Sequence, residues 1–580
     1  FRDGKTNICY NCLDRHLEKR GDKVAYYWVG NDGEKKTYTY KQLHKEVCKV
    51  ANAYKKLGIK KGDRIAFYMP MIVELAIAML AAVRIGAIHS VVFGGFSAQA
   101  LAARVLDSEC KLIITTDAVM RGPKKIQLKK VVDDAVEICK KENFKVQNVI
   151  VYNRLGEKVE EKEEDIKWED FIKGMEETCD VEWLWAEDPL FMLYTSGSTG
   201  KPKGLIHTHG GYMVYAGTTH KYIFDVHEDD TYWCGADIGW ITGHTYILYG
   251  PLLNGARSIF YEGTPTCPSP SICWKIVEEY KVTQFYTAPT VIRSLMVTGK
   301  DPVKKHDRSS LRVMGSVGEP INPEAWQWYY DVVGEQKASI VDTYWQTETG
   351  GIIVTPLPGA TPMKPGSATR PFFGIDPVLV DADGNIIPEG HKNTVEGFLA
   401  IRKPWPGIAR TCYGNHERYE DVYFSRFDGY YVTGDACKRD ADGYYWIIGR
   451  VDDVLNVSGH RLGTAEIESA IVSHPSVAEA AVVPVPHEIK GQAIYAFVTT
   501  VENIEYNEAL KKEINLLVRK ELGAIASLQA IHWAPGLPKT RSGKIMRRVL
   551  RKIAVNDTKE LGDLSTIADS TVIPKLIEYW

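Results

Sequence analysis

The chain has 580 residues, which is too long for one compact core and predicts at least two domains. It is 44% hydrophobic and 25% charged, with a formal net charge of -3, as is typical of a soluble globular protein. Because there is no basic excess, nucleic acid is not an expected partner. The longest apolar run, residues 75–83, is too short to span a bilayer, so we expect no membrane partner either.

Eleven cysteines are scattered along the chain, and Cys9 and Cys12 form the one close pair. A second pair at the spacing of a zinc ribbon is missing, so we interpret the cysteines as reduced thiols of an intracellular protein. The cytoplasm is the simplest location, with the nucleus and the mitochondrion left open. We recognise no signal peptide, but the sequence starts inside an apparently folded segment, and a preceding piece can carry targeting information.

Short apolar strands alternate with helical patterns in the first part of the chain. The pattern predicts strands over 64–69, 111–116 and 146–152, and helices over 73–85 and 131–141. Such alternation indicates parallel sheets covered by helices. The charged run 157–169 is expected to be a solvated surface excursion.

A second alternating segment covers residues 211–349, and a β-rich stretch with many turn signals follows over 351–449. Beyond residue 449 the pattern predicts helices over 465–473 and 509–522 and strands over 477–485 and 493–501. We therefore predict an α/β protein. Residues 1–450 would form a large N-terminal domain of parallel-type sheets with a β-rich subdomain, and residues 451–580 a small α+β domain, with the boundary at 450–453.

One loop carries an unusual density of glycine, hydroxyl and lysine residues: Thr195-Ser196-Gly197-Ser198-Thr199-Gly200-Lys201-Pro202-Lys203-Gly204. Glycine lets the backbone approach an anion, hydroxyls and N–H groups donate, and lysine neutralises charge, so the loop is predicted to hold phosphates. A Walker A loop needs Gly where Thr195 stands and Ser or Thr where Pro202 stands. An ordinary P-loop NTPase is therefore disfavoured, and a Gly/Ser-rich surface turn is the alternative.

Four later segments fit nucleotide chemistry. Tyr344 follows a strand-like run and offers a face for adenine, and Glu348 can bind Mg²⁺ on the phosphates. Asp435 can accept hydrogen bonds from ribose hydroxyls, and Arg450 can contact ribose or phosphate. Lys544 lies on a Gly-flanked turn. Taken alone, Asp435 can equally be a turn aspartate and Lys544 a solvated lysine.

In this order, from Thr195 to Lys544, the five motifs resemble those of the adenylate-forming superfamily of acyl-CoA synthetases, peptide-synthetase adenylation domains and firefly-type luciferases. The resemblance narrows to the acetyl-CoA synthetase family and covers nearly the whole chain. An N-terminal segment that is usual in that family is not recognised in this sequence. The segments that carry it are Val92-Phe93-Gly94-Gly95-Phe96-Ser97, Gly239-Trp240-Ile241-Thr242-Gly243-His244, Gly315-Ser316-Val317-Gly318-Glu319-Pro320, Tyr344-Trp345-Gln346-Thr347-Glu348-Thr349-Gly350-Gly351 and residues 538–548.

The resemblance implies an AMP-forming ligation of acetate to coenzyme A, with ATP, Mg²⁺ and CoA as the small molecules used. Lys544 would be needed for adenylate formation. The C-terminal domain would rotate about a hinge at Asp452 before thioester formation, which brings Gly459 to the pantetheine. The ATP and AMP contacts implied are Thr195, Ser196, Gly197, Ser198, Thr199, Gly200, Lys201, Gly318, Glu319, Pro320, Asp342, Thr343, Tyr344, Trp345, Gln346, Thr347, Asp435, Arg450 and Arg461.

The resemblance also implies sites for the thiol substrate, the acid and a cation. The CoA contacts are Arg121, Lys124, Thr242, Thr266, Ala288, Ser458 and Arg519. Lys124 stands where many relatives have Arg, and Thr266 where many have Asn. The acetate pocket would be formed by Ile241, Thr242, Val317 and Trp345, with the indole limiting acyl length. Two metal sites are implied: Glu348 would contact the ATP-bound Mg²⁺, and a separate cation site would use Val472, His474 and Val477, in part through backbone carbonyls. His474-Pro475 also fits a helix stop.

Three functional hypotheses follow from the sequence. The first is acetate–CoA ligation. The second is the same reaction with propionate as main substrate, which the Trp345 pocket argues against. The third is a catalytically silent binding protein, which the intact motif residues argue against. Luciferase-like chemistry is disfavoured by the CoA-type motifs. A lysine acetyltransferase and deacetylase acting on Lys544 are expected partners, and the oligomeric state stays open.

Overall fold

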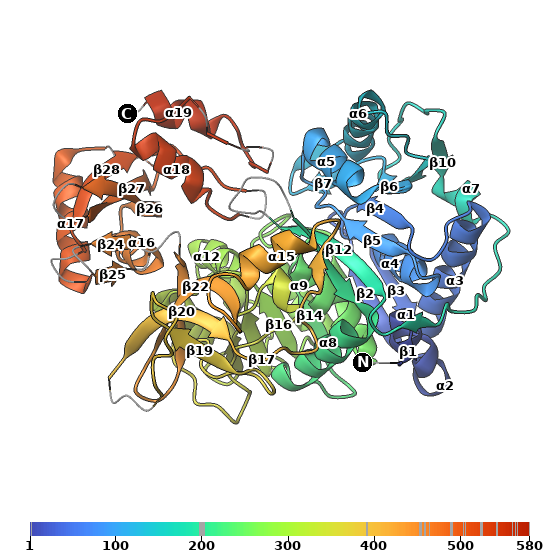
Figure 1. Cartoon of the computed structure of the whole chain (residues 1–580), viewed down its shortest axis with the longest axis horizontal. Helices are drawn as coiled ribbons and strands as arrows, with labels where there is room; N and C mark the ends of the chain where they lie inside the picture. The colour runs from blue at the N-terminus through green and yellow to red at the C-terminus, as the bar shows by residue number, and fades with distance from the viewer. Residues whose placement is uncertain are drawn as a thin grey trace. The chain divides into compact units, whose positions relative to one another are not determined.

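The computed structural model describes the chain apart from residues 2, 196–202, 390–392, 452–454, 458–459, 463, 488–490, 503, 505, 523–525, 541–542, 560, 563, 565 and 579–580. The chain divides into two compact units. The first unit comprises Phe1–Lys364, Ala368–Ile375 and Pro404–Val422, and the second unit comprises Pro365–Ser367, Asp376–Lys403 and Tyr423–Trp580. Figure 1 shows the elements of both units in chain colours.

An eight-stranded sheet lies in the first unit. Its strands, in spatial order, are β10 (Asp165–Lys167), β9 (Asn148–Tyr152), β6 (Leu112–Thr116), β4 (Arg64–Tyr68), β5 (Ile88–Val91), β12 (Pro189–Thr195), β13 (Lys203–Thr208) and β21 (Thr411–Cys412). The strands from β10 to β12 are parallel, whereas β13 and β21 add to them antiparallel. The phosphate loop predicted from the sequence therefore joins two strands of one antiparallel pair.

A seven-stranded sheet forms the second layer of this unit. Its order is β18 (Ser339–Asp342), β17 (Val313–Ser316), β16 (Gln284–Thr287), β14 (Thr231–Cys234), β15 (Arg257–Tyr261), β2 (Val24–Val29) and β3 (Lys35–Thr39). Only the β2–β3 pair is antiparallel. Because parallel neighbours end at the same edge, the carboxyl ends of β16, β17 and β18 meet there. Two short antiparallel pairs complete the unit: β1 (Lys5–Thr6) with β11 (Leu184–Trp185), and β7 (Val119–Arg121) with β8 (Lys124–Ile126).

Helices cover these sheets, and local sequence explains several of their ends. The Thr39 hydroxyl accepts a bond from the Gln42 N–H at 3.2 Å while the Gln42 side chain accepts one from the Thr39 N–H at 2.9 Å, so a capping box starts α3. The helices of this unit are α1 (Ile8–Cys12), η1 (Asp14–His16), α2 (Leu17–Arg20), α3 (Tyr40–Lys56), α4 (Val73–Arg84), α5 (Ala98–Ser108), α6 (Leu128–Lys141), α7 (Trp168–Ile172), α8 (His209–Ile223), α9 (Ile241–Gly243), η2 (His244–Tyr249), α10 (Gly250–Leu253), α11 (Ile272–Tyr280), α12 (Pro289–Val297), α13 (Asp301–Lys304), α14 (Pro323–Trp328), η3 (Tyr329–Val333), η4 (Thr347–Thr349) and most of α15 (His416–Tyr423).

The core explains why some helices are amphipathic and one is not. Helices α5 and α6 pack together on one face of the eight-stranded sheet, with Leu101, Val105 and Val136 in the shared core (Figure 1). Every residue of α4 is buried except Glu74, and apart from Glu74 and the C-terminal Arg84 all of them are apolar, so the helix has no polar face. Helix α4 is thus an internal element, as its uninterrupted apolar run indicates.

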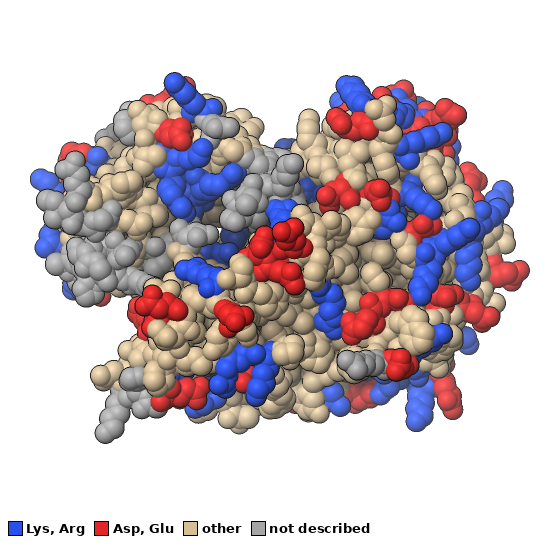
Figure 2. Space-filling model, viewed as in Figure 1, with Lys and Arg blue, Asp and Glu red and all other residues tan. Residues whose placement is uncertain are grey.

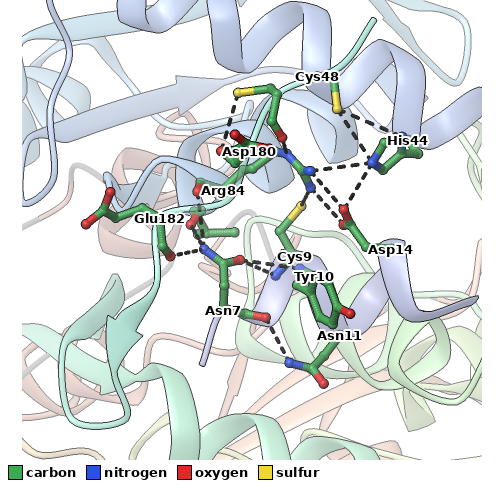
Figure 3. Close-up of polar contacts among 12 residues, drawn as sticks. Asn7, Cys9, Tyr10, Asn11, Asp14, His44, Cys48, Arg84, Asp180 and Glu182 are labelled. Carbon is green, nitrogen blue, oxygen red and sulfur yellow. Dashed lines mark hydrogen bonds and ion pairs between the residues drawn. The ribbon is translucent and has the colours of Figure 1, made fainter. Parts of the chain in front are cut away.

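A buried ion-pair network ties the N-terminal segment to α3 and α4 (Figure 3). The Arg84 guanidinium, only 3% exposed, donates to both Asp14 carboxylate oxygens at 2.8 and 2.9 Å, and its Nε donates to the Cys179 carbonyl at 2.7 Å. His44 Nε2 lies 3.2 Å from Asp14 Oδ1. Burial raises the pKa of Asp14, but its hydrogen bonds with Arg84 and His44 outweigh burial and lower that pKa to about 2.

The second unit contains two sheets. The antiparallel one consists of β19 (Pro377–Val380), β20 (Val395–Ile401), β22 (Tyr431–Arg439) and β23 (Tyr445–Arg450). The other consists of β25 (His460–Leu462), β24 (Leu455–Val457), β27 (Gly491–Thr500), β26 (Val477–His487) and β28 (Leu528–Trp533). Helices α16 (Thr464–Val472) and α17 (Glu508–Leu522) share a core with alternate residues of β26, and α18 (Arg547–Ala554) and α19 (Val572–Glu578) with the intervening ones. Both faces of β26 are therefore buried, which explains its continuous apolar run.

Side chains of both charges are mixed on the surface, in agreement with a formal net charge close to zero. Figure 2 shows Lys and Arg mixed with Asp and Glu over the visible face of the first unit, and basic side chains gathered around α18 of the second. Among the described residues, every helix is too short or too polar to cross a membrane. All eleven cysteines are free thiols, and all but Cys267 are buried.

The structure confirms the predicted α/β class and the alternating elements, with shifts of at most a few residues at their ends. The charged run 157–169 is only partly a solvated excursion, because β10 extends the eight-stranded sheet and Trp168 is buried. Part of the β-rich stretch 351–449 forms the sheet of β19, β20, β22 and β23 in the second unit, whereas its strand β21 joins the eight-stranded sheet of the first. The domain boundary at 450–453 adjoins undescribed residues and stays a prediction.

Candidate active site

The phosphate loop leaves β12 at Thr195 and enters β13 at Lys203, and these two residues face each other in register. Ser196, Gly197, Ser198, Thr199, Gly200 and Lys201 lie outside the described residues. The Thr195 hydroxyl is buried and has no hydrogen-bond partner among the described residues, and Lys203 is buried. The exit strand is anchored, because the amides of Arg410 and Tyr413 donate to the carbonyls of Ile206 at 2.9 Å and Gly204 at 2.7 Å.

Nucleotide-motif residues gather at the carboxyl edge of the seven-stranded sheet. Thr287, Ser316 and Asp342 are in register at the ends of β16, β17 and β18, so Ala288, Val317 and Thr343 follow at the same edge. Ligands of open α/β sheets bind outside the carboxyl ends of strands, so this edge is the expected place for a nucleotide. Gly318, Glu319 and Pro320 are exposed there, and Gly318 has a φ of 97°, which favours glycine.

Asp342 lies at that edge with its carboxyl group buried. Desolvation raises the pKa of Asp342 to about 7. Tyr344 is also buried, and its amide donates to the Val354 carbonyl at 2.9 Å, so its backbone is fixed at this edge. Gln346, Thr347 and Glu348 are half-buried.

The turn that carries Glu348 is held by donors from several distant segments. The carbonyls of four consecutive residues accept hydrogen bonds: Thr347 from His207 Nε2 at 2.8 Å, Glu348 from the Ala409 amide at 2.8 Å, Thr349 from Trp405 Nε1 at 2.9 Å and Gly350 from the Thr245 hydroxyl at 3.1 Å. The backbone under the Glu348 side chain is therefore fixed from outside the turn. A rigid supporting shell of this kind pre-organises a binding side chain.

His207 is a neutral donor in this arrangement. Burial lowers the pKa of His207 to about 3. A carbonyl oxygen only accepts, so the ring proton lies on Nε2. Sequence reasoning missed His207, Thr245, Trp405 and Ala409, since each acts on a residue far away in the chain.

Trp345 lies half-buried between aromatic partners. Its indole packs edge-on against Tyr246, with ring centroids 5.1 Å apart and an interplanar angle of 85°, and its Nε1–H donates to the Tyr286 hydroxyl at 3.2 Å. Tyr246 belongs to η2, which directly continues the helix α9 that carries Ile241 and Thr242. The structure thus places Trp345 against η2, which continues the helix of two other predicted pocket residues, Ile241 and Thr242. Ile241 and Val317 are 8% and 5% exposed, and Thr242 is half-buried.

The predicted CoA contacts of the first unit lie on a hairpin and a neighbouring loop. Arg121 and Lys124 pair across the β7–β8 hairpin, and the Arg121 guanidinium lies 4.7 Å over the Phe93 ring. A Cβ added at Gly122 in the hairpin turn would lie 3.8 Å from the Thr264 hydroxyl, so the hairpin approaches the loop that contains Thr266. These positively charged side chains suit phosphate groups.

Two predicted ribose residues are neighbours in the second unit. Asp435 of β22 and Arg450 of β23 face each other, and Arg450 Nη1 lies 3.7 Å from Asp435 Oδ1. Arg450 Nη1 also donates to the Thr433 carbonyl at 3.1 Å. Only the backbone of Arg461 is described, in β25, and Arg519 lies in α17.

Lys544 is exposed at the end of a tight turn. The Thr540 amide donates to the Lys544 carbonyl at 2.7 Å, and the Thr540 hydroxyl accepts from the Lys544 amide at 3.2 Å. Asp452, Ser458 and Gly459 lie outside the described residues.

The predicted cation site lies between α16 and β26. His474 Nδ1 accepts from the Ser476 amide at 3.2 Å, and His474 Nε2 lies 3.5 Å from a Glu513 carboxylate oxygen. The Val477 amide donates to the His474 carbonyl at 2.9 Å. Among the described residues no cluster of three or more His, Cys, Asp or Glu side chains has a metal-binding arrangement. A site built in part from backbone carbonyls needs no such cluster, so the cation site and the helix stop both stay predictions for His474. Val472 ends α16.

Comparison with known protein families identifies the family to which the chain belongs. The AMP-binding enzyme family model matches residues 13–413, and the model of the AMP-binding enzyme C-terminal domain matches residues 466–544. The chain therefore belongs to the AMP-binding enzyme family, which confirms the superfamily predicted from the motifs.

Within that family the chain is similar to acetyl-coenzyme A synthetases. It is 58% identical to the enzyme of that name from Mesorhizobium japonicum, over 100% of this chain and 88% of the relative. It is 56% identical to the chloroplastic/glyoxysomal acetyl-coenzyme A synthetase of Arabidopsis thaliana, over 100% of this chain and 78% of the relative. The solved acetoacetyl-CoA synthetase from Streptomyces lividans shares the fold, with a TM-score of 0.88 at 23% identity over 99% of this chain and 86% of that one.

Proposed function

We propose that the protein ligates acetate to coenzyme A in an AMP-forming reaction. In the first step an acetate oxygen attacks the α-phosphorus of ATP and pyrophosphate leaves. In the second step the CoA thiolate attacks the carbonyl carbon of acetyl-AMP and AMP leaves. The observation that supports the proposal is the segment from Trp345 to Gly350, which is fixed from outside by several hydrogen bonds. It carries both Trp345, which would close the acyl pocket, and Glu348, which would hold Mg²⁺.

The first step needs charge stabilisation rather than a general base, because acetate is already ionised at neutral pH. The Lys544 ammonium would bridge the acetate carboxylate and the α-phosphate, and the loop 195–204 would hold the departing pyrophosphate. Glu348 fits Mg²⁺, which binds proteins through one or two carboxylates together with substrate phosphates. Bound there, Mg²⁺ would neutralise phosphate charge.

The second step would use another arrangement of the same chain. We assign residues 1–450 to the adenylation domain and residues 451–580 to a mobile domain with its hinge at Asp452. Rotation would withdraw Lys544 and bring Ser458 and Gly459 to the pantetheine, while Arg121 and Lys124 would bind CoA phosphates. The absent side chain of Gly459 would let pantetheine approach the backbone.

Regulation and location complete the proposal. Acetylation of the exposed Lys544 would remove its positive charge. It would therefore stop adenylation, and a lysine acetyltransferase and a deacetylase would be the partners. The buried free thiols fit a reducing compartment, and we assign the cytoplasm.

The deciding experiment is acid-dependent exchange of radiolabel between pyrophosphate and ATP, measured with acetate, propionate and butyrate. We expect exchange to be fastest with acetate and to disappear in Lys544→Ala. Absence of exchange in the intact protein would favour the hypothesis of a catalytically silent binding protein. Exchange that is fastest with propionate would favour propionate as the main substrate.

A further inference from the structure

A chain of three hydrogen bonds runs from the indole of Trp345 to the end of strand β17. Trp345 Nε1 lies 3.2 Å from the Tyr286 hydroxyl, this hydroxyl lies 2.7 Å from the Thr343 hydroxyl, and the Thr343 hydroxyl lies 2.7 Å from the Ser316 carbonyl. Ser316 directly precedes Val317. This series of hydrogen bonds therefore connects Trp345 with the residue before Val317, and both Trp345 and Val317 are predicted walls of the acyl pocket.

The direction of each bond follows from the groups. An indole N–H only donates, so the Tyr286 oxygen accepts from it. A backbone carbonyl only accepts, so the Thr343 hydroxyl gives its proton to Ser316. The Tyr286 hydroxyl proton is then directed to the Thr343 oxygen. Each hydroxyl accepts one bond and donates one, and such connected chains strengthen one another in a buried setting.

Burial makes the chain costly to break. Tyr286 is 0% exposed and Thr343 6%, so water is not at hand to replace a lost partner. The Trp345 ring also packs against Tyr246, which is itself fixed: its hydroxyl donates to the Thr219 hydroxyl and accepts from the Ile352 amide, both at 3.0 Å. The indole is thus held along its edge and by a neighbouring ring.

We propose that Tyr286 is a specificity-determining positioning residue that limits acyl chain length by holding Trp345 in one orientation. The inference rests on the proposed function, in which Trp345 closes the acyl pocket. Packing discriminates one extra methylene by about 10- to 200-fold, but only when the wall does not give way. An indole free to rotate would admit propionate, so the hydrogen bond from Nε1 to Tyr286 maintains the discrimination.

The test is the ratio of kcat/KM for propionate to kcat/KM for acetate in Tyr286→Phe. This change keeps the buried ring and removes one hydroxyl. We expect the ratio to rise about fivefold, because this factor corresponds to the free energy that one intramolecular hydrogen bond contributes. The matched control is Tyr329→Phe, since Tyr329 is also buried in the seven-stranded sheet core but its hydroxyl donates to the Phe285 carbonyl at 3.2 Å. The control should lose the same kind of bond and leave the ratio unchanged.

A double mutant separates positioning from other effects. If Tyr286 acts through the indole, adding Tyr286→Phe to Trp345→Gly should leave the ratio at the value of Trp345→Gly alone. Should Tyr286→Phe fail to fold, Thr343→Val removes the next hydroxyl of the chain and should move the ratio in the same direction.

The outcomes distinguish this inference from the proposed function. A shifted ratio in Trp345→Gly with an unshifted ratio in Tyr286→Phe overturns the inference and leaves acetate ligation standing. A further shift in the double mutant overturns it as well, because Tyr286 would then act on the substrate by another route. An unshifted ratio in Trp345→Gly rejects the pocket itself, and the inference falls with it.

Discussion

The hydrogen bond from His207 to the Glu348 turn leads to a prediction that separates support of the site from catalysis. His207→Phe keeps an aromatic ring of similar size but removes the donor to the Thr347 carbonyl. Leaving a buried carbonyl without its donor costs about 1–3 kcal/mol. The Gly350 amide still donates to the same carbonyl at 3.3 Å, so we expect the lower part of that range, about 1.4 kcal/mol or tenfold.

We expect this tenfold effect in the concentration of Mg²⁺ that acetyl-AMP formation requires. Because Glu348 would hold Mg²⁺, the Mg²⁺ concentration for half-maximal acetate-dependent exchange should rise about tenfold in His207→Phe. Excess Mg²⁺ should restore most of the rate. His207→Gln should stay near wild type, since its side-chain amide can donate to the same carbonyl.

Two controls make the result interpretable. His209 is equally buried, and its ring nitrogens have no hydrogen-bond partner among the described residues, so His209→Phe should leave the Mg²⁺ dependence unchanged. Burial lowers the pKa of His207 to about 3, so the effect of His207→Phe should be the same at pH 6 and pH 8. An unaltered Mg²⁺ requirement in a folded His207→Phe, or an equal change in His209→Phe, would refute the reasoning.

Three further predictions concern the pocket, the catalytic lysine and the ion-pair network. Trp345→Gly should shift the preference from acetate towards longer straight-chain acids, measured as kcat/KM for each acid; an unchanged order would reject the acyl pocket. Lys544→Ala should abolish exchange yet spare thioester formation from supplied acetyl-AMP, so equal loss of both steps would contradict its assignment. Burial lowers the pKa of His44, but hydrogen bonds to Asp14 and Cys48 outweigh it and raise that pKa to about 9. Stability from a raised histidine pKa is fully present below the unfolded value near 6.5 and is lost as the pH rises through 9. Hydrogen exchange of the segment around Asp14 should therefore show easier local opening at pH 9 than at pH 6.5, and His44→Gln should flatten this dependence.

Much of the fold could be predicted because its elements have local signatures. The apolar run of α4, the short buried runs of β4, β6 and β9, and the two-sided apolar pattern of β26 each reflect one element's own burial. The strand β10 inside a charged run could not be predicted this way, since a three-residue edge strand has too few residues to show a period. The position of β2 and β3 beside β15 also had no local signal, because it depends on pairing across more than 200 residues of chain.

The site shows the same division. By itself the sequence determined the family and with it the class of chemistry. It also predicted phosphate binding by the glycine-, hydroxyl- and lysine-rich loop from Thr195 and nucleotide binding by the segment from Asp342 to Glu348. These motifs are contiguous because a loop that surrounds a phosphate is built from neighbouring residues.

The tertiary structure alone decided how that chemistry is held in place. It placed His207 under Thr347 and the Tyr286 hydroxyl against Trp345, across 140 and 59 positions of sequence. A buried carbonyl or indole N–H requires a partner, but any donor or acceptor brought there by the fold can satisfy it. For that reason no spacing in the sequence announces the residues that fix Glu348 and Trp345, although the proposed reaction depends on them.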